Sequence, residues 1–328
     1  MTKCLITGGA GFIGSHLVEE CLDRGFGVIV VDNLYSGKRE NLPVEHPRLE
    51  FLEGDITDRA LLKEIRKKHG DIDYLFHLAA IPSVTLSMEN PVYTHKVNFE
   101  GTLFLLESFK GSAIKKFVFA SSAAVYGDTK KVPVGEDVLP APLSPYGADK
   151  LGAEYFLKIF NDAFHMPTLA CRFFNVFGER QDPSSPYSGV ISIFFDRALA
   201  AKKGKKAAMD IYGDGKHTRD FIYVKDVVRA CLYLAEKGDI KGDVLNIGYQ
   251  KKTTILDLAK AVQRIMEVDV PVNFREPREG DVLHSTANIQ RLKKTGFEFA
   301  YDFDHGLKRL AEFLLHQGTT DRGEHQYR

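Results

Sequence analysis

The chain has 328 residues, of which 44% are hydrophobic and 27% charged, a composition that excludes disordered and fibrous proteins. This length predicts two domains, or one large α/β unit with a lobe added to it. The 44 basic and 44 acidic residues cancel, so no overall field attracts nucleic acid or anionic lipid, and we expect neither nucleic acid nor a membrane as a partner.

The cysteines Cys4, Cys21, Cys171 and Cys231 lie far apart and form no CxxC pair, and no histidine stands at metal-ligand spacing. We therefore expect no disulfide framework and no metal site. The N-terminal residues show no apolar leader, and no run approaches the ~18 apolar residues of a membrane span. These features predict a soluble protein of the reducing cytoplasm.

The first half of the chain alternates short apolar runs with segments of helical length. The predicted strands are Cys4 to Thr7, Val28 to Val31, Leu49 to Leu52, Tyr74 to Leu78, Phe117 to Ala120 and Leu169 to Arg172. The predicted helices are Ile13 to Arg24, Arg59 to Lys68, Val92 to Ser108 and Tyr146 to Phe164. Continuous apolar strands are typical of parallel sheets buried on both faces. The alternation predicts an α/β fold with a Rossmann-type doubly wound parallel sheet.

Beyond Asn175 the pattern loosens. Helices are predicted at Val190 to Ala201, Ile255 to Met266 and His305 to Leu315, and Val244 to Ile247 is predicted as a buried strand that returns to the first sheet. We therefore expect a cofactor-binding domain of residues 1–174 plus about 218–250. A smaller mixed α/β substrate lobe is expected at 175–217 plus 251–316, followed by a polar tail at 317–328.

Three glycines follow the first predicted strand at the spacing GxxGxxG. Gly8 would allow a tight turn, Gly11 the close approach of a pyrophosphate, and Gly14 close packing of helix on strand. The pyrophosphate would sit at the positive end of the following helix. A glycine pattern alone is weak evidence, but here a strand precedes it and a helix follows it, which predicts a bound dinucleotide.

Two acidic residues extend this prediction. Asp32 ends the second strand, where a carboxylate can bind both hydroxyls of the adenosine ribose and repels a 2′-phosphate, so NAD is favoured over NADP. The basic pair Lys38 and Arg39 weakly favours the opposite choice. Asp55 follows the third strand and could reach the adenine amino group, although by itself it is better interpreted as an ordinary turn residue.

Tyr146 and Lys150 form a Tyr-x-x-x-Lys pair one turn apart on one helix face. The helix begins at Ser144-Pro145, so Tyr146 lies in the first turn, where the positive helix end favours phenolate. With the nearby ammonium of Lys150 and the cationic nicotinamide of NAD, this predicts a lowered phenol pKa and a general base. The alternative is a surface helix pair. Ser122, at the carboxyl end of the fifth strand where such sheets bind ligands, favours the catalytic interpretation.

The segments Thr7 to Gly14, Ser121 to Gly127 and Ser144 to Lys150 resemble the extended short-chain dehydrogenase/reductase family, and within it the NAD-dependent nucleotide-sugar 4-epimerases. The resemblance runs to about His316. It implies a catalytic trio of Ser122, Tyr146 and Lys150. It also implies NAD contacts by Gly8, Gly11, Phe12, Ile13, Gly14, Asp32, Asn33, Asp55, Ile56, Leu78, Ala79, Ala80, Asn98, Tyr146 and Lys150.

The same resemblance implies a site for a nucleotide-sugar substrate. Its residues would be Ser83, Ser122, Tyr146, Asn175, Arg219, Arg278, Asp281 and Ser285, with the two arginines on the diphosphate. A small residue at Ser285 resembles family members that admit an N-acetyl group, as does Gln181-Asp182-Pro183. The expected substrates are therefore UDP-GlcNAc and UDP-GalNAc, with UDP-Glc and UDP-Gal also accepted.

The implied reaction is transient oxidation at the sugar C4 by NAD and return of the hydride to the other face. Ala123 and Ala124 stand where family dehydratases carry acidic residues, which argues against dehydration. An oxidoreductase that releases NADH, another nucleotide-sugar enzyme of the family and a non-catalytic NAD-binding sensor remain as alternatives. The resemblance also implies a homodimer that pairs the helices at 92–108 and 146–164.

Overall fold

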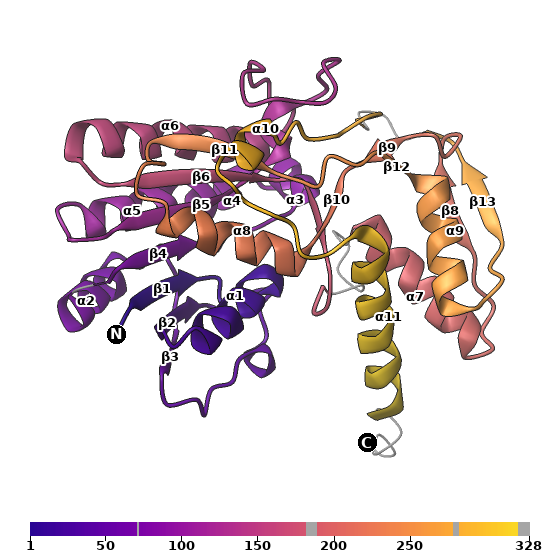
Figure 1. Ribbon diagram of the computed structural model, residues 1–328, viewed down its shortest axis with the longest axis horizontal. Helices are drawn as coiled ribbons and strands as arrows, with labels where there is room; N and C mark the ends of the chain where they lie inside the picture. Colours follow the sequence, from indigo (N-terminus) through magenta and orange to yellow (C-terminus); the bar gives the residue numbers. More distant parts are fainter. Residues whose placement is uncertain (71, 182–188, 278–281, 321–328) are drawn as a thin grey trace.

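The computed structural model describes residues 1–70, 72–181, 189–277 and 282–320, the last four by their backbone only. Its centre is a seven-stranded sheet in the order β11-β6-β5-β4-β1-β2-β3 (Figure 1). The strands are β1 (Lys3–Thr7), β2 (Gly27–Asp32), β3 (Leu49–Glu53), β4 (Tyr74–His77), β5 (Lys116–Ser122), β6 (Thr168–Phe173) and β11 (Asp243–Ile247). Every neighbouring pair is parallel, so the predicted doubly wound sheet and the return of the chain to it are confirmed.

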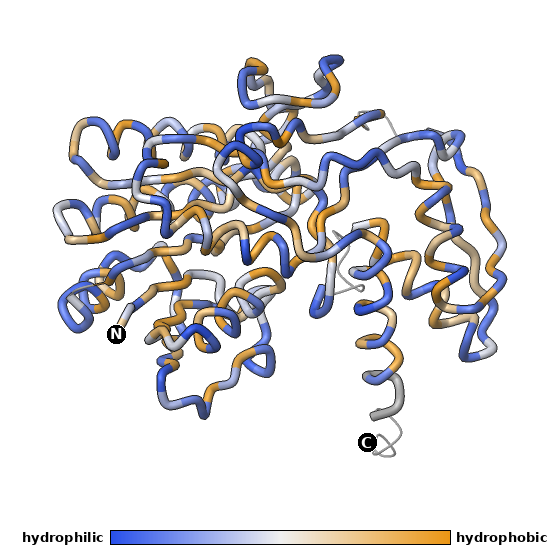
Figure 2. Tube along the Cα trace, in the orientation of Figure 1, coloured by the Kyte–Doolittle hydropathy of each residue, from blue (hydrophilic) through white to orange (hydrophobic). Residues whose placement is uncertain are grey.

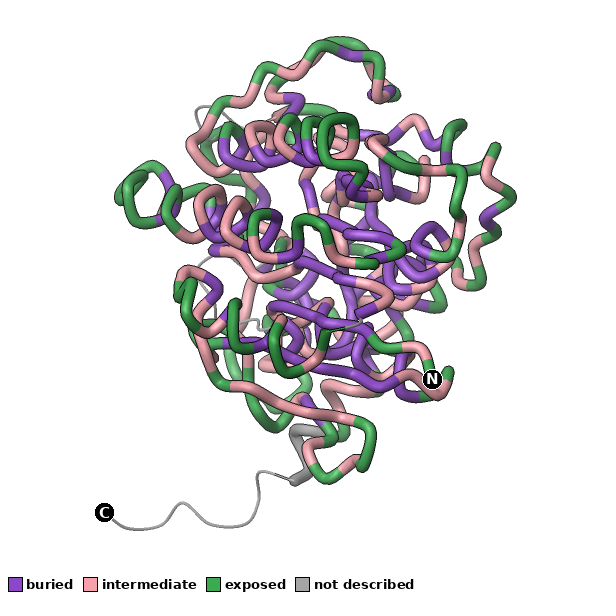
Figure 3. The backbone as a smooth tube through the Cα atoms, turned by 90° about the vertical axis from the view of Figure 1, so that its left-hand side faces the viewer, coloured by how far each residue is buried: buried purple, intermediate pink, exposed green. Residues whose placement is uncertain are grey.

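Helices cover both faces of this sheet because successive side chains of each strand point to opposite faces. Buried residues of α2 (Arg59–His69), α5 (Gly101–Phe109) and α6 (Pro145–Phe164) form one core with one set of strand residues. Those of α1 (Phe12–Asp23) and α8 (Val224–Glu236) form a second core with the alternate set. Hydrophobic residues accordingly follow the strands in Figure 2, and buried residues fill the centre of Figure 3.

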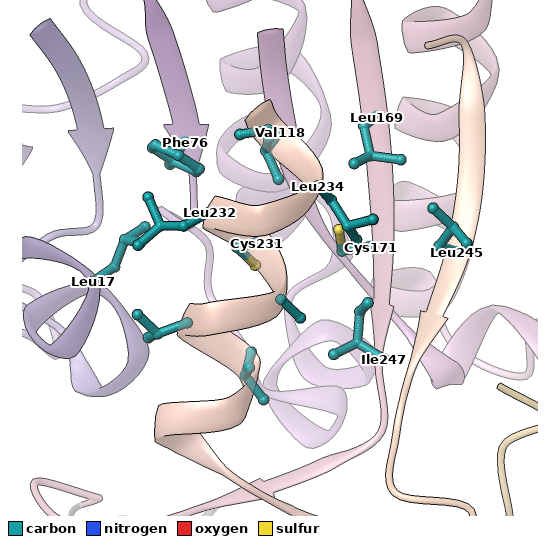
Figure 4. Packing of buried hydrophobic residues seen from close by; sticks show 14 of the residues in the cluster. Leu17, Phe76, Val118, Leu169, Cys171, Cys231, Leu232, Leu234, Leu245 and Ile247 are labelled. Atoms are coloured by element: carbon teal, nitrogen blue, oxygen red, sulfur yellow. The ribbon is translucent and has the colours of Figure 1, made fainter. Parts of the chain in front are cut away.

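Helix α8 has no counterpart among the predicted elements. Its apolar residues come in adjacent pairs, such as Val227-Val228 and Leu234-Ala235, because the helix packs on the sheet and against α1 at once. Figure 4 shows Leu232 beside Phe76 of β4 in this core. A short apolar run with such pairs does not by itself distinguish a helix from a strand.

Three further elements differ from their predictions. The helix expected at 92–108 consists of α4 (Pro91–His95), a π-helical turn at Lys96–Glu100, and α5, and α3 (Val84–Glu89) precedes it. Strand β3 is only partly buried because it forms the edge of the sheet. Helix α11 (Phe303–Thr320) continues past the expected end, so the start of the predicted tail at 317–328 is helical, and residues 321–328 lie outside the described residues.

A second, smaller lobe of mixed α and β structure lies beside the sheet, as expected (Figure 1). It contains α7 (Val190–Lys202), α9 (Ile255–Met266) and α11, which share a core that includes Phe194, Leu258 and Leu307. Its short strands pair as β7 (Asn175–Phe177) with β10 (Phe221–Tyr223), β8 (Met209–Tyr212) with β13 (Val272–Arg275), and β9 (Thr218–Arg219) with β12 (Thr253–Thr254). The part of the chain described here has no helix long and apolar enough to cross a bilayer.

Candidate active site

A cavity of about 1150 Å³ is lined by residues of both the parallel sheet and the second lobe. The sheet side includes the loop after β1, the ends of β2, β4 and β5, and the start of α6. The lobe side includes residues of α7, β8 and β9. Strand β1 pairs with both β2 and β4, so the strand order reverses beside the cavity. Ligands of doubly wound sheets bind at such a reversal.

The glycine loop forms a close-fitting cradle on the sheet side of this cavity. Gly8 has φ +72°, and a Cβ there would lie 2.5 Å from the Ala79 nitrogen. A Cβ at Gly14 would lie 2.1 Å from the Gly8 carbonyl oxygen. Gly11 is the N-cap of α1 and offers no side-chain cap, and Phe12 and Ile13 of the first turn line the cavity with it. The start of α1 therefore suits a pyrophosphate, as the sequence predicts.

The two predicted acidic residues line the cavity next to this loop. Asp32 accepts hydrogen bonds from the backbone nitrogens of Ala10 (2.9 Å) and Leu34 (2.8 Å), and burial raises its pKa. Burial also acts to raise the pKa of Asp55, but hydrogen bonds, among them one from Asn33 (2.8 Å), outweigh it and lower that pKa. Each carboxylate retains acceptor capacity for ligand hydroxyl or amino groups.

The strand end at Leu78, Ala79 and Ala80 lines the cavity, as do Asn33 and Ile56. Ser83 also lines it and accepts from the Leu86 nitrogen at 2.8 Å, which caps α3. Asn98 is not part of the wall. It is 1% exposed, and its amide side chain accepts from the Ile81 nitrogen (2.7 Å) and donates to the Ile81 oxygen (3.1 Å). Asn98 thus fixes the backbone of the wall from behind.

The predicted trio comes together in the cavity wall, which Ser122, Tyr146 and Lys150 all line. Ser122 ends β5 and its side chain is hydrogen-bonded to that of Tyr146. Lys150 is 2% exposed, donates to the Ala120 oxygen at 2.8 Å, and lies 5.9 Å from the centre of the Tyr146 ring. Helix α6 begins as predicted, with Ser144 accepting from the Gly147 nitrogen at its N-cap.

The groups of the chain alone do not lower the Tyr146 pKa, and the predicted lowering also depends on the cationic nicotinamide of NAD. Burial raises this pKa, and the hydrogen bond with Ser122 opposes burial without overcoming it. Burial also lowers the pKa of Lys150 to about 8, against the attraction of Asp149 and Glu154. The physical reason is desolvation, which disfavours the charged forms of both residues and which a helix pattern does not reveal.

On the lobe side, Asn175 and Arg219 line the cavity as predicted. Asn175 donates to the Asp220 oxygen (3.1 Å), and Arg219 donates to the Thr218 oxygen (3.1 Å). Ser285 is not one of the lining residues, although its backbone nitrogen donates to the same Thr218 oxygen at 3.0 Å. Of the remaining predicted residues, Gln181 lines the cavity, whereas Arg278, Asp281, Asp182 and Pro183 lie outside the described residues.

Several polar residues of the wall were not predicted. All of them lie in or next to the second lobe. They are Arg180, Arg197, Asp210, Tyr212 and His217. Arg197 lies on α7 and Tyr212 ends β8, and no motif marks either residue. His217 adjoins the segment that contains Arg219, which is the one signal that could have indicated it.

The described residues contain no cluster of histidine, cysteine or acidic side chains able to hold a metal ion. His77 is 1% exposed and is hydrogen-bonded to Thr7 (2.7 Å) and Thr102 (2.9 Å) through its two ring nitrogens. Burial keeps its pKa well below the usual value. Both ring nitrogens are therefore occupied within the protein, which gives His77 a structural role.

Comparisons with known proteins agree with this geometry. The model of the NAD-dependent epimerase/dehydratase family matches residues 4–248. A putative UDP-glucose 4-epimerase of Methanocaldococcus jannaschii is 38% identical over 317 residues, which cover 96% of this chain and 99% of the relative. Two solved structures are each 39% identical and cover 96% of this chain and 99% of theirs. One is a UDP-N-acetylglucosamine 4-epimerase of Methanobrevibacter ruminantium in complex with UDP-N-acetylmuramic acid (TM-score 0.90), the other a UDP-glucose 4-epimerase of Thermotoga maritima with UDP-glucose (TM-score 0.89).

Proposed function

Since this chain belongs to the NAD-dependent epimerase/dehydratase family, we propose that it interconverts UDP-hexoses that differ in configuration at C4. The observation that carries the proposal is the meeting of Ser122, Tyr146 and Lys150 in one cavity with the glycine cradle. The full-length similarity to proteins named as UDP-sugar 4-epimerases supports it.

The residues of the sheet side fit NAD. A Cβ at Gly8 or Gly14 would collide with backbone, and one at Gly11 would lie 3.3 Å from the Gly8 oxygen, so the three glycines allow the tight backbone path at the start of α1, which suits a pyrophosphate. Asp32 would accept from the adenosine ribose hydroxyls and Asp55 from the adenine amino group. When bound, NAD supplies a reversible hydride acceptor beside the sugar.

Each member of the trio has a separate task in this proposal. Tyr146 removes the proton of the C4 hydroxyl and returns it after inversion, as general base and then general acid. Ser122, hydrogen-bonded to Tyr146, orients the phenol and the sugar oxygen. The ammonium of Lys150, 5.9 Å from the centre of the phenol ring, would favour the phenolate that burial disfavours.

The second lobe would bind the nucleotide sugar. Arg219 and Asn175 face the cavity and suit the diphosphate and the sugar, with Arg278, Asp281 and Ser83 proposed to assist them. In terms of domains, residues 1–174 plus about 224–250 would hold NAD. Residues 175–223 plus 251–316 would select the sugar nucleotide, because β9 and β10, expected in the first domain, pair with strands of the second lobe.

The N-acetylated sugars are proposed as the preferred substrates. Gln181 lines the cavity, and the backbone nitrogen of the small Ser285 donates to the carbonyl oxygen of Thr218, the residue before Arg219. The two similar structures carry one acetylated and one plain hexose in their complexes, which supports acceptance of both kinds by the family.

The test is incubation of the purified protein with UDP-GlcNAc and with UDP-glucose separately, followed by chromatography of the products and absorbance at the NADH band. An epimerase yields UDP-GalNAc or UDP-Gal without net absorbance change. Stoichiometric formation of NADH would instead identify an oxidoreductase. A 4-keto-6-deoxy sugar product would identify a dehydratase, and the absence of any conversion would identify a non-catalytic sensor. Tyr146→Phe is the control variant and should abolish conversion.

A homodimer in the cytoplasm is proposed as the working form. Large apolar side chains are exposed on α4 and α6, among them Val92 (80%), Tyr155 (57%) and Ile159 (50%), which supports pairing of these helices between two copies. The four cysteines are free and buried, which supports a reducing compartment. Analytical ultracentrifugation of wild type and of Ile159→Glu checks the dimer, since the charge should yield monomers.

A further inference from the structure

Behind the proposed trio lies a buried ion pair that the proposed reaction does not use. Glu154 and Arg172 are 5% and 4% exposed. The carboxylate of Glu154 accepts from Nε (2.9 Å) and Nη2 (2.6 Å) of Arg172, a bidentate arrangement. Glu154 also accepts from the hydroxyl of Ser121 at 2.5 Å. One carboxylate therefore joins helix α6 to the neighbouring strands β5 and β6.

The positions of these residues connect the pair to the site. Tyr146, Lys150 and Glu154 are spaced by four residues along α6 and lie on one face of it. Ser121 lines the cavity and is the residue before Ser122. The carboxylate of Glu154 thus links the helix that carries the phenol and ammonium to the strand end that carries the hydroxyl.

Further contacts fix Arg172 itself. Ser121, Arg172 and Asn246 occupy one row across β5, β6 and β11, since Arg172 is the register partner of both. The guanidinium lies 4.6 Å from the centre of the Tyr126 ring, and the Tyr126 hydroxyl donates to Asn246 at 2.7 Å. The Arg172 guanidinium is therefore held by the Glu154 carboxylate and the Tyr126 ring, while its buried Nη1 has no hydrogen-bond partner among the described residues, and Glu154 has a fixed partner to bind.

A buried ion pair is a poor source of stability. Removing two charges from water costs several kcal/mol per ion, and apolar replacements of such pairs are often neutral or stabilising. Packing alone therefore gives no reason for charges behind this site, whereas a directional, bidentate contact sets the distance between helix and strand precisely.

We propose that Glu154, held by Arg172, is a positioning residue that fixes the Tyr146–Lys150 face of α6 against the Ser121-Ser122 strand end. This inference rests on the proposed function for its kinetic consequence. The negative charge of Glu154 has a second effect, because it favours the ammonium form of Lys150. Lys150 also faces Asp149 on its own helix and His77 from β4.

The experiment compares four variants with wild type. Glu154→Gln removes the negative charge. The double variant, Glu154→Met with Arg172→Met, replaces the whole ion pair by apolar side chains and keeps the test valid if the single variant does not fold. Thr168→Val is the matched control, since the fully buried Thr168 hydroxyl donates to the Leu157 oxygen (2.8 Å) and joins the same α6 and β6 away from the cavity. Glu154→Asp tests whether the shorter carboxylate restores the contact.

We expect the folded double variant to melt no lower than Thr168→Val and yet to lose about 10- to 100-fold in kcat, with KM within about two-fold of wild type. Glu154→Asp should recover part of kcat, and in Glu154→Gln the alkaline limb of the kcat profile should move to lower pH, because the loss of a negative charge lowers the Lys150 pKa. A kcat of the double variant within about two-fold of wild type, or equal losses in Thr168→Val, would overturn the proposal.

Amide hydrogen exchange gives a readout that does not depend on activity. The double variant should exchange faster at 120–122 and 146–150 than wild type, whereas Thr168→Val should change exchange only around 156–160. Unchanged exchange at 120–122 and 146–150 would overturn the positioning role. If the wild type converts no sugar, the proposed function fails while the exchange comparison still decides this inference.

Discussion

The ammonium of Lys150 donates to the carbonyl oxygen of Ala120 at 2.8 Å, so the lysine is anchored to β5 while it faces the Tyr146 ring. We expect Lys150→Met to lower kcat by about 100-fold or more, because the phenolate loses its cation. Burial lowers the Lys150 pKa to about 8, so the ammonium is lost as pH rises through that value and wild-type kcat should fall there. Steady-state kinetics between pH 6 and 10 should show this alkaline limb in wild type alone.

Lys116→Met is the matched control for that variant. Lys116 is buried like Lys150 but lies on β5 itself. It donates to the Lys237 oxygen (2.8 Å) at the far end of that strand and does not line the cavity. This variant should lose thermal stability and keep wild-type kcat. An equal loss of kcat in both variants would contradict a specific role for Lys150.

Gly14→Ala should abolish cofactor binding, because the added Cβ would lie 2.1 Å from the Gly8 oxygen and would displace the glycine loop. The measurement is the rise in melting temperature on addition of NAD, which reports ligand binding to the folded state. Gly238→Ala meets nothing within 4 Å and should keep the NAD-dependent rise. A full rise in Gly14→Ala would show that the cradle does not bind the pyrophosphate.

Arg219→Met should raise KM for the UDP-sugar about 10- to 100-fold, the value of one or two hydrogen bonds to a charged group, with a smaller change in kcat. The exposed Arg264 pairs with Asp304 at 3.4 Å and does not line the cavity, so Arg264→Met is the control. Initial-rate kinetics distinguish the two. A KM for Arg219→Met equal to that of the control would remove Arg219 from the substrate site.

Ser285→Tyr should narrow the substrate range to plain hexoses. An aromatic ring next to the Thr218 carbonyl that Ser285 contacts would occupy space on the Arg219 side of the cavity. We expect kcat/KM for UDP-GlcNAc to fall by about 10-fold or more while that for UDP-glucose changes little. Ser285→Ala, which stays small, should behave as wild type, and an unchanged preference in Ser285→Tyr would mean that this residue does not select the sugar.

His16 predicts part of the acid sensitivity of the fold. Its ring is 2% exposed and bonded to the Glu179 oxygen (2.9 Å), and burial lowers its pKa to about 3. Below pH 6.5, the ordinary pKa of histidine, His16 binds a proton in the unfolded chain but not in the folded chain. The free energy of unfolding therefore decreases as the pH falls from neutral. Between pH 7 and 5 this loss is about 2 kcal/mol. Between pH 7 and 5 the free energy of unfolding in urea should fall less for His16→Gln than for wild type, by that amount. Equal pH dependence of the two proteins would contradict the role assigned to His16.

Much of the candidate site could be predicted because its motifs are local. Gly8 to Gly14 span the turn after β1 and the first residues of α1, and Tyr146 and Lys150 share a helix face through their spacing alone. Parallel strands also place Ser122 at the ligand-binding edge before any contact is known. Asn98 illustrates the limit, since it was assigned to the cofactor by resemblance, whereas in the structure its side chain holds the backbone of Ile81.

The glycine cradle and the Tyr146–Lys150 pair are predictable from the chain alone because each depends on residues close together in it, and the alternation of apolar strands with helices is enough to predict a parallel sheet. The packing of α8, the second-lobe residues that reach the cavity and the rise of the Tyr146 pKa on burial become known only from the folded structure. It also brought Glu154 to Arg172 behind the trio. These features depend on contacts between distant segments and on the desolvation that those contacts cause. The periodicity of a single strand or helix contains no information on either cause.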